Sequence, residues 1–471
     1  MKVNNVEIDA ECITLVVPEN RQNPDSRQIE LPVMRIPATG AATAEPIFHL
    51  AGGPGMSNMD FRPPAALLEN HDVVLVGYRG VDGSVRLDCP EMAQASKGDK
   101  NDLFSQASQT AMADAITGCG QRLRQAGIDL DGYTPLAVAE DIEAAREALG
   151  YERIHLLSES YATRVAQLYA QLQPNRVFRS VMIGVNPPGR FVWEPEMIDQ
   201  QLRLYADLCA GDEDCRQRTV DLTETMRQVF NTMPSRWLLF PINAGKVKAV
   251  TFALLFNRST ATQVFDAYLA AANGDYSGLA LMSLAYDFVL PNMVVWGDFL
   301  AKAYSADFDP QRDYTTLANP DTVMGSPISQ LVWPVARGWP MARMPEAFRH
   351  VQPSAVETLL ISGNLDFSTP VDYAAKELLP ALENGQHLIL SEMGHTSDFW
   401  QLQPDAAAHL LRTYFDTGQA DEASYTDQPM RFKTGFFTFP RLAKIAIALP
   451  LGIFILLAGL AGRVWLKRRG H

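Results

Sequence analysis

Residues 153–174 read RIHLLSESYATRVAQLYAQLQP, and the order of apolar and polar positions in this stretch indicates the fold. A short apolar strand, Arg153–Leu157, runs directly into SESYA and then into a helical pattern. A serine at such a sharp strand-to-helix turn has its hydroxyl lifted clear of the sheet, and its strained backbone requires small residues two positions away on each side. Those positions hold Ser158 and Ala162, where the usual pattern has glycine. Ser160 is therefore a candidate nucleophile, although a serine in an ordinary loop can also cap a helix.

Further apolar runs alternate with helical patterns on both sides of this stretch. Residues 72–78 (DVVLVGY) are apolar nearly throughout, as in a strand that is buried on both faces of a parallel sheet. Residues 135–149 have helical spacing and are followed by Gly150, a typical helix stop. This alternation predicts an α/β fold with a mostly parallel sheet and helices on both faces. The other strands are expected at residues 28–37, 46–50, 179–185, 357–362 and 386–390.

The strand pattern is interrupted by a long region of helical character that is rich in Trp, Met and Phe. We therefore expect an α/β core formed by residues 1–185 and 346–417, with a mainly helical cap inserted over residues 186–345. A linker over residues 418–442 then leads to a predicted transmembrane helix over residues 443–466.

A glycine-rich turn follows the early strand at residues 46–50. It reads AGGPG over residues 51–55, where an α/β fold of this kind places its second oxyanion donor. Pro54 has no N–H, so we assign the donor to Gly53, and the first donor to the amide of Tyr161. A phosphate-binding loop fits less well, because the Gly-Lys-Ser/Thr ending and the dinucleotide spacing are missing. The residues expected to support the turn and the loop are Ser158, Glu159, Ala162, Gly52, Pro54 and Gly55.

An acid and a histidine follow the last two expected strands. Asp366 lies in GNLDFSTP, and His395 ends the sequence MGH. The order Ser160, Asp366, His395 is the triad order of this fold, in which the acid orients the imidazole that takes the serine proton. Each residue alone has an ordinary structural interpretation, such as a turn aspartate or a buried histidine. All of them in this order, each after a strand, predict a catalytic triad.

These motifs together resemble the proline iminopeptidase and tripeptidyl aminopeptidase branch of the α/β hydrolases. Residues 51–55 are similar to that branch's oxyanion motif, residues 78–84 (YRGVDGS) resemble its D-x-R-G-x-G-x-S element, and GNLDFSTP and MGH match its acid and histidine motifs. The resemblance implies an α/β-hydrolase fold, no cofactor and a peptide substrate with a free N-terminus. It covers roughly residues 10–190 and 355–415 and is vague through the cap.

The sequence departs from the family pattern at several positions. Ser158 and Ala162 replace glycines of the nucleophile turn, Ala51 replaces a histidine, and Gly184 replaces an aspartate. We also find no motif in the cap that identifies acidic residues for the amino group of a substrate.

The expected chemistry is acyl transfer to water through a covalent serine intermediate, with no metal required. The substrate inferred from the resemblance is a peptide cleaved from its N-terminus. A carboxylesterase or lipase-like hydrolase is an alternative, because the same triad also cleaves esters. A membrane-anchored binding protein without catalysis is a second alternative, favoured by the altered turn. The oligomeric state is left open.

Charge divides the chain into an acidic body and a basic tail. The formal net charge of the 471 residues is −14, and no acidic residue follows Asp427. Such a charge argues against a general affinity for nucleic acid. Residues 445–462 (IAIALPLGIFILLAGLAG) contain no charge and are bracketed by Lys and Arg, which predicts a membrane span. A buried helix of the body is the alternative interpretation.

The cysteines bear on the compartment of the body. The first twelve residues contain no apolar signal segment, which taken literally favours a cytoplasmic body. Cys209 and Cys215 bracket a short loop, and Cys89 and Cys119 flank an excursion and resemble a pair found in the family, so both are candidate disulfides. Zinc binding fits worse, because no histidine lies near either pair. We therefore expect a periplasmic or extracytoplasmic body.

Overall fold

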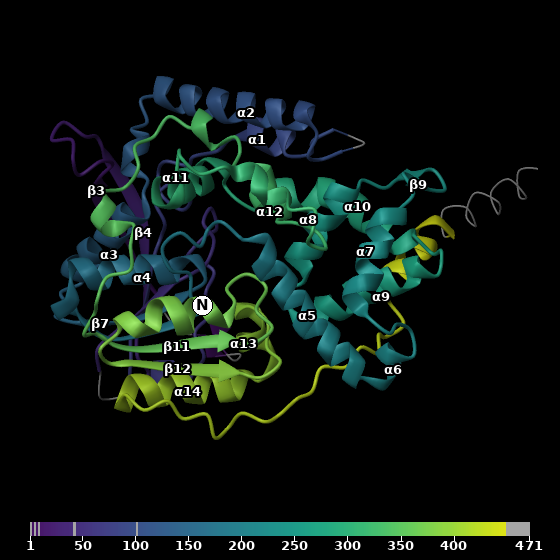
Figure 1. The fold of residues 1–471 in the computed structure, drawn as a ribbon. Coiled ribbons are helices and arrows are strands. Elements are labelled where there is room, and N and C mark those ends of the chain that lie inside the picture. The colour runs from purple at the N-terminus through teal and green to yellow at the C-terminus, as the bar shows by residue number, and fades with distance from the viewer. Residues whose placement is uncertain (1, 4–5, 8–9, 41–43, 100–101, 449–471) are drawn as a thin grey trace, which may run out of the picture.

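The computed structural model describes residues 2–3, 6–7, 10–40, 44–99 and 102–448 of the chain. Its centre is a sheet of eight strands in the order β12-β11-β8-β7-β5-β6-β4-β3 (Figure 1). Neighbouring strands are parallel except where β4 pairs with β3 and with β6, so the predicted, mostly parallel sheet is confirmed. The strands are β3 (Glu11–Pro18), β4 (Gln28–Ile36), β5 (Ile47–Leu50), β6 (Val73–Val76), β7 (Ile154–Glu159), β8 (Val177–Ile183), β11 (Glu357–Gly363) and β12 (Gly385–Leu390). A separate short hairpin is formed by β1 (Lys2–Val3) and β2 (Val6–Glu7).

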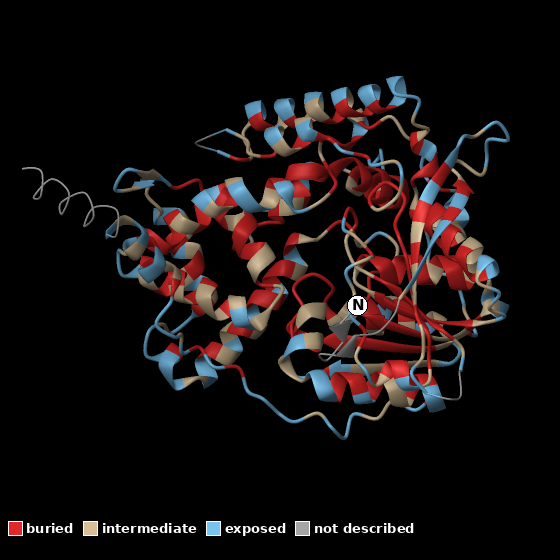
Figure 2. Ribbon diagram, turned by 180° about the vertical axis from the view of Figure 1, so that it is seen from behind, coloured by how far each residue is buried: buried red, intermediate tan, exposed pale blue. Residues whose placement is uncertain are grey.

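Helices cover both faces of the sheet. Successive side chains of a strand point to opposite faces, so each strand contributes to the core on both sides. In β6, Val74 and Val76 join the core cluster under the helices α3 and α4, whereas Val73 and Leu75 join the cluster under α13 and α14. The central strands are accordingly buried throughout (Figure 2). The helices of the core are α1 (Pro90–Ala95), α2 (Gln106–Gln125), α3 (Pro135–Ala148), α4 (Tyr161–Leu172), α13 (Thr396–Leu402) and α14 (Pro404–Thr417).

The segment between β8 and β11 is mainly helical and lies at the end of the sheet towards which β11 and β12 point (Figure 1). Its helices are α5 (Pro195–Gly211), α6 (Glu213–Arg216), α7 (Leu222–Thr232), α8 (Ala244–Leu254), α9 (Arg258–Ala272), α10 (Ser277–Val289), α11 (Trp296–Asp307) and α12 (Pro327–Val332). A hairpin of β9 (Arg236–Trp237) and β10 (Phe240–Pro241) lies between α7 and α8. We refer to this segment as the cap.

After α14 the chain crosses from the core to the cap in residues 418–448, which we call the strap and which contain no helix before residue 439. The Arg258 side chain donates to the carbonyl of Gln428 at 2.8 Å, which ties the strap to α9. Met430 and Phe432 are buried, and the ring of Phe432 lies 5.9 Å from that of Phe265. Residues 439–448 are helical.

The predicted membrane span at residues 443–466 lies largely outside the described residues, which end at residue 448. Within the described part of the chain, we find no single helix with both the length and the apolar composition to cross a bilayer. One pair of helices, Ser277–Asn292 and Trp296–Asp307, meets these criteria when taken together, with a bend of 80° between them.

Both candidate cysteine pairs are bonded in the structure. Cys89 is joined to Cys119, which connects the start of α1 to α2, and Cys209 is joined to Cys215 between α5 and α6. Cys12 is free and exposed. Disulfides persist in oxidising compartments and are rare in the cytosol. The two bonds are therefore evidence on the compartment in which the body folds.

Thiol alkylation should therefore modify the folded, unreduced protein at Cys12 alone. All five cysteines should react after reduction in denaturant, because both disulfides are then open. The intact mass and a peptide map report the number and the sites of the added groups. Reaction of Cys89, Cys119, Cys209 or Cys215 before reduction would contradict the bond that contains that cysteine, and reaction of all four would also contradict the extracytoplasmic placement.

Candidate active site

Ser160 lies at the junction between β7 and α4, where its backbone takes φ 51° and ψ −124°. A non-glycine residue in this positive-φ region is strained by about 1–3 kcal/mol and persists only where its surroundings hold it. The Ser160 N–H donates to the carbonyl of Ile183 on the neighbouring strand β8 at 2.8 Å. The structure thus contains the sharp turn that the sequence predicts.

The two departures from glycine in this turn are accommodated by packing. Ser158 is fully buried, and its hydroxyl donates to the carbonyl of Val181 on β8 at 3.1 Å. Ala162 is also fully buried in the first turn of α4. Since each side chain is small and the buried hydroxyl has a partner, neither substitution disturbs the turn.

Ser160, His395 and Asp366 meet although they are far apart in the sequence. The Nε2 atom of His395 lies 2.8 Å from the Ser160 hydroxyl oxygen, and its Nδ1 atom lies 2.8 Å from Oδ2 of Asp366. An ionised carboxylate only accepts hydrogen bonds, so it favours the tautomer with the proton on Nδ1. Nε2 is then free to accept the serine proton.

The carboxylate of Asp366 is held in a fixed orientation by the residues that follow it. Its Oδ1 accepts the backbone N–H groups of Ser368 and Thr369, both at 2.8 Å. Its Oδ2 accepts the Thr369 hydroxyl at 2.7 Å in addition to the imidazole of His395. The carboxylate is 1% exposed, so these donors replace water.

The glycine-rich loop lies against the nucleophile. A Cβ atom on Gly52 would lie 3.1 Å from the Cβ of Ser160, so the loop approaches as closely as it does because this residue is glycine. Gly53 and Tyr161, the predicted oxyanion donors, line the same cavity as Ser160. Their role as donors remains a prediction that this proximity supports.

Asn58 holds the loop in place, and the sequence reasoning did not single it out. Its side-chain oxygen accepts the N–H of Ala51 at 2.7 Å. Its amide nitrogen donates to the carbonyls of His49 at 3.0 Å and of Val76 at 2.9 Å, at the ends of β5 and β6. Beneath the loop, the predicted support residue Glu159 accepts a hydrogen bond from Nε2 of His49 at 2.9 Å.

A buried ion pair in the cap also holds the loop. Asp298 and Lys302 on α11 are both fully buried, and the Lys302 ammonium lies 2.7 Å from the carboxylate. Asp298 accepts the Gly55 N–H at 3.1 Å, and Lys302 donates to the carbonyl of Arg79 at 3.2 Å. Burial raises the pKa of Asp298, and the ammonium of Lys302 opposes this shift. The only sequence signal for the pair is its i,i+4 spacing, which is more typical of exposed helix surfaces.

The cap also contacts the loop that carries the histidine. The His395 N–H donates to the carbonyl of Phe256 at 2.6 Å. Asp398 accepts the N–H groups of Gly394 at 2.8 Å and of Arg258 at 3.0 Å, so one carboxylate bridges core and cap. Burial raises the pKa of Asp398, while these two N–H groups lower it.

Ser160 opens into a cavity of about 180 Å³ between the core and the cap. Its wall is almost entirely apolar and aromatic, and no Asp, Glu, Lys or Arg is among the described residues that line it. Asn186 lines it as well, and its side-chain oxygen is buried without a hydrogen-bond partner among the described residues. The apolar wall is formed mainly by Met56, Phe191, Trp193, Phe252, Phe256, Leu290, Met293, Val294, Trp296, Phe299, Ile328, Leu331 and Val332.

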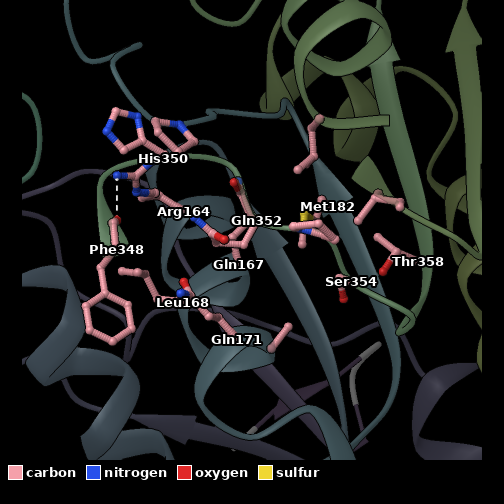
Figure 3. A pocket seen from close by; sticks show the side chains of 15 residues that line it. Arg164, Gln167, Leu168, Gln171, Met182, Phe348, His350, Gln352, Ser354 and Thr358 are labelled. Atoms are coloured by element: carbon pink, nitrogen blue, oxygen red, sulfur yellow. Dashed lines mark hydrogen bonds between the residues drawn. The ribbon is translucent and has the colours of Figure 1, made fainter. Parts of the chain in front are cut away.

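A second cavity lies along α4 between Arg164 and Gln171, and the buried Arg164 side chain donates there to the carbonyl of Phe348 at 3.1 Å (Figure 3). It measures about 30 Å³, which is enough for one or two water molecules but not for a substrate.

No group of three His, Cys, Asp or Glu side chains in the described residues is arranged to hold a metal ion.

Comparisons with known families agree with this geometry. The family described as "alpha/beta hydrolase fold" matches residues 45–210, and the family described as "TAP-like protein" matches residues 327–427. These two ranges contain Ser160, Asp366 and His395. The chain has the α/β-hydrolase fold.

Among curated relatives, a tripeptidyl aminopeptidase of Streptomyces lividans is 28% identical over 217 residues, 42% of this chain and 40% of the relative. The serine protease Hip1 of Mycobacterium tuberculosis is 28% identical over 224 residues, 43% of this chain and 42% of the relative. The matched region thus spans about two fifths of the length of these curated relatives. A thermophilic esterase from Thermogutta terrifontis aligns with 86% of this chain and 98% of its own, at 12% identity and a TM-score of 0.39.

Gly184 lies against the candidate triad and allows a matched test. The residue has φ +66°, and a Cβ atom there would lie 3.0 Å from the Thr369 hydroxyl and 3.1 Å from Cε1 of His395. Gly150 has φ +75°, but a Cβ atom there would meet nothing within 4 Å. A side chain at position 184 would therefore press on the imidazole, whereas one at position 150 would only strain the backbone.

Gly184→Ala should lower kcat on a chromogenic ester by about tenfold or more, because small displacements of a catalytic group are costly. Gly150→Ala should keep the wild-type kcat while losing about 1 kcal/mol of stability, since alanine is strained at positive φ. Steady-state kinetics and chemical denaturation of both variants check this. Equal kcat values for the two variants would show that Gly184 does not protect the triad.

Proposed function

We propose that this α/β hydrolase is a membrane-anchored serine exopeptidase that cleaves peptides from a free N-terminus. The proposed hydrolysis rests on the contacts from Asp366 to His395 and from His395 to Ser160, both at 2.8 Å. The named relatives support a peptidase rather than another acyl hydrolase. The anchor rests on the uncharged residues 445–462, and an extracytoplasmic body is supported by the two disulfides.

The proposed mechanism follows from the hydrogen-bond directions. His395 takes the proton of Ser160 as the hydroxyl oxygen attacks the substrate carbonyl, and Asp366 stabilises the imidazolium that forms. The amides of Gly53 and Tyr161 receive the developing oxyanion, a donor pair of a kind worth about 2.7–4 kcal/mol per member. The imidazolium then protonates the leaving amine, and water releases the acyl group by the same steps in reverse order.

The cavity wall suggests which acyl groups enter. Apolar and aromatic side chains surround Ser160, so the residue whose carbonyl is attacked should carry an apolar side chain. Asn186 offers an unpaired buried oxygen at this wall, which a substrate N–H or ammonium would satisfy. In this proposal Asn186 binds the nitrogen side of a peptide substrate.

A carboxylesterase or lipase-like activity is the second candidate, and one observation favours it. No carboxylate is among the described residues that line the cavity, although an ammonium group is best bound by a negative charge. An ester with an apolar acyl group requires no such partner. The two candidates share the triad and differ in whether Asn186 contributes to binding.

Peptides with apolar side chains and free N-termini should lose N-terminal residues, and mass spectrometry reports how many leave in each step. Asn186→Ala should raise KM for these peptides by about fivefold, the effect of one lost hydrogen bond, and leave KM for a short acyl ester unchanged. Peptides whose N-terminus is acetylated should resist cleavage. Turnover of esters alone, with no peptide cleaved, would favour the second candidate.

A further inference from the structure

The C-terminal end of the strap is attached to the start of α10. The Ser277 hydroxyl donates to the carbonyl of Pro440 at 3.3 Å, and Lys444 lies 2.6 Å from the carboxylate of Asp275. A Cβ atom on Gly278 would lie 3.0 Å from the ring of Pro440, so the two segments are in close contact. The sequence continues from this point into the uncharged residues 445–462. The expected anchor therefore leaves the body beside α10.

Exposed apolar side chains gather on three elements around this point. They lie on the outer face of α10, at the tip of the β9–β10 hairpin, which packs against α10, and on the strap just before its helix. Figures 1 and 2 both show the hairpin and the strap helix at the same end of the cap. We call these residues the docking face: Leu238, Leu239, Leu284, Phe288, Phe436 and Phe437.

The exposure of this face is unusual for a protein surface in water. Leu239 is 91% exposed and Phe288 is 70% exposed. Most of the surface of these two side chains is therefore not packed against other described residues. Leu284 and Phe288 are spaced i,i+4 and so lie on one side of α10. Exposed apolar side chains gathered on neighbouring elements favour an interaction site over a scatter of single residues.

The composition of the docking face suits a bilayer surface. The hairpin reads Arg236-Trp237-Leu238-Leu239-Phe240, which combines a basic residue, an indole and leucines in the manner of interfacial anchors. The strap adds the exposed basic residue Arg441, which suits anionic headgroups. A membrane span that begins beside this face would hold it against the same bilayer.

We propose that the docking face lies in the surface of the bilayer that anchors the chain. This inference rests on the anchor of the proposed function and is independent of catalysis. The C-terminal end of α10 leads to Met293, which is 48% exposed and lines the active-site cavity together with Met56, which is 47% exposed. Exposed apolar side chains thus lie both on α10 and at the rim of the cavity, so in this proposal apolar substrates held in the bilayer approach Ser160 from this side of the cap.

The test uses the full chain with Ser160→Ala, so that no outcome depends on activity, and with Cys12→Ser, so that no free thiol remains. A single cysteine is introduced by Leu239→Cys or by Phe288→Cys and labelled with an environment-sensitive fluorophore. Val220→Cys is the matched control, because Val220 is an apolar cap residue that is 100% exposed and lies outside the docking face. The proteins are reconstituted into vesicles of phosphatidylcholine and phosphatidylglycerol that contain lipids with a nitroxide near the headgroup.

Labels at positions 239 and 288 should lose fluorescence by about twofold or more on adding the nitroxide lipid, with little change at position 220. Co-sedimentation with vesicles but equal quenching at all three positions would overturn the docking face and leave the anchor standing. Failure to co-sediment would overturn both, and the proposed hydrolysis would be unaffected. Protection of the labels that depends on protein concentration instead of lipid would identify a second copy as the occupant and also overturn the proposal.

Discussion

The left-handed backbone at Ser160 is the constraint on which the active site depends. It turns the chain from β7 into α4 within one residue and leaves the hydroxyl at the edge of the sheet instead of inside it. The strain is balanced by surroundings that leave little freedom: the Ser160 N–H is bound to Ile183, and Ser158 is buried and bonded to β8. His395 arrives from the loop after β12, so its distance to the serine is set by the same sheet.

The cap is part of the active site as well as a cover over it. Asp298 on α11 binds the amide of Gly55 in the loop that holds a predicted oxyanion donor. On the other side of the cavity, Asp398 and the carbonyl of Phe256 join the histidine loop to the start of α9. Both catalytic loops of the core are therefore attached to cap helices by buried polar groups. A movement of the cap that admits substrate would also act on the geometry of the triad and of the oxyanion loop.

Much of the sheet and the triad could be predicted from local patterns. The strands are short apolar runs, and Ser160, Asp366 and His395 each follow one of them, so order along the chain was enough to place all three at one edge. The roles of Asn58 and Asp298 could not be predicted in this way. Asn58 bonds to carbonyls that are adjacent only after β5 and β6 pair, and Asp298 meets Gly55 across 243 positions of sequence. The long helix α2 was missed because its sequence is mostly polar, with only one narrow side buried.

The most direct test of the account is labelling of the folded protein with a fluorophosphonate, which reacts with a serine hydroxyl only where a base activates it. One adduct is expected, located on Ser160 by peptide mapping, and it should be lost in a His395→Ala variant that retains the wild-type melting temperature. No adduct on the folded protein, or an adduct on Ser160 that forms equally fast without the imidazole, would contradict the central claim.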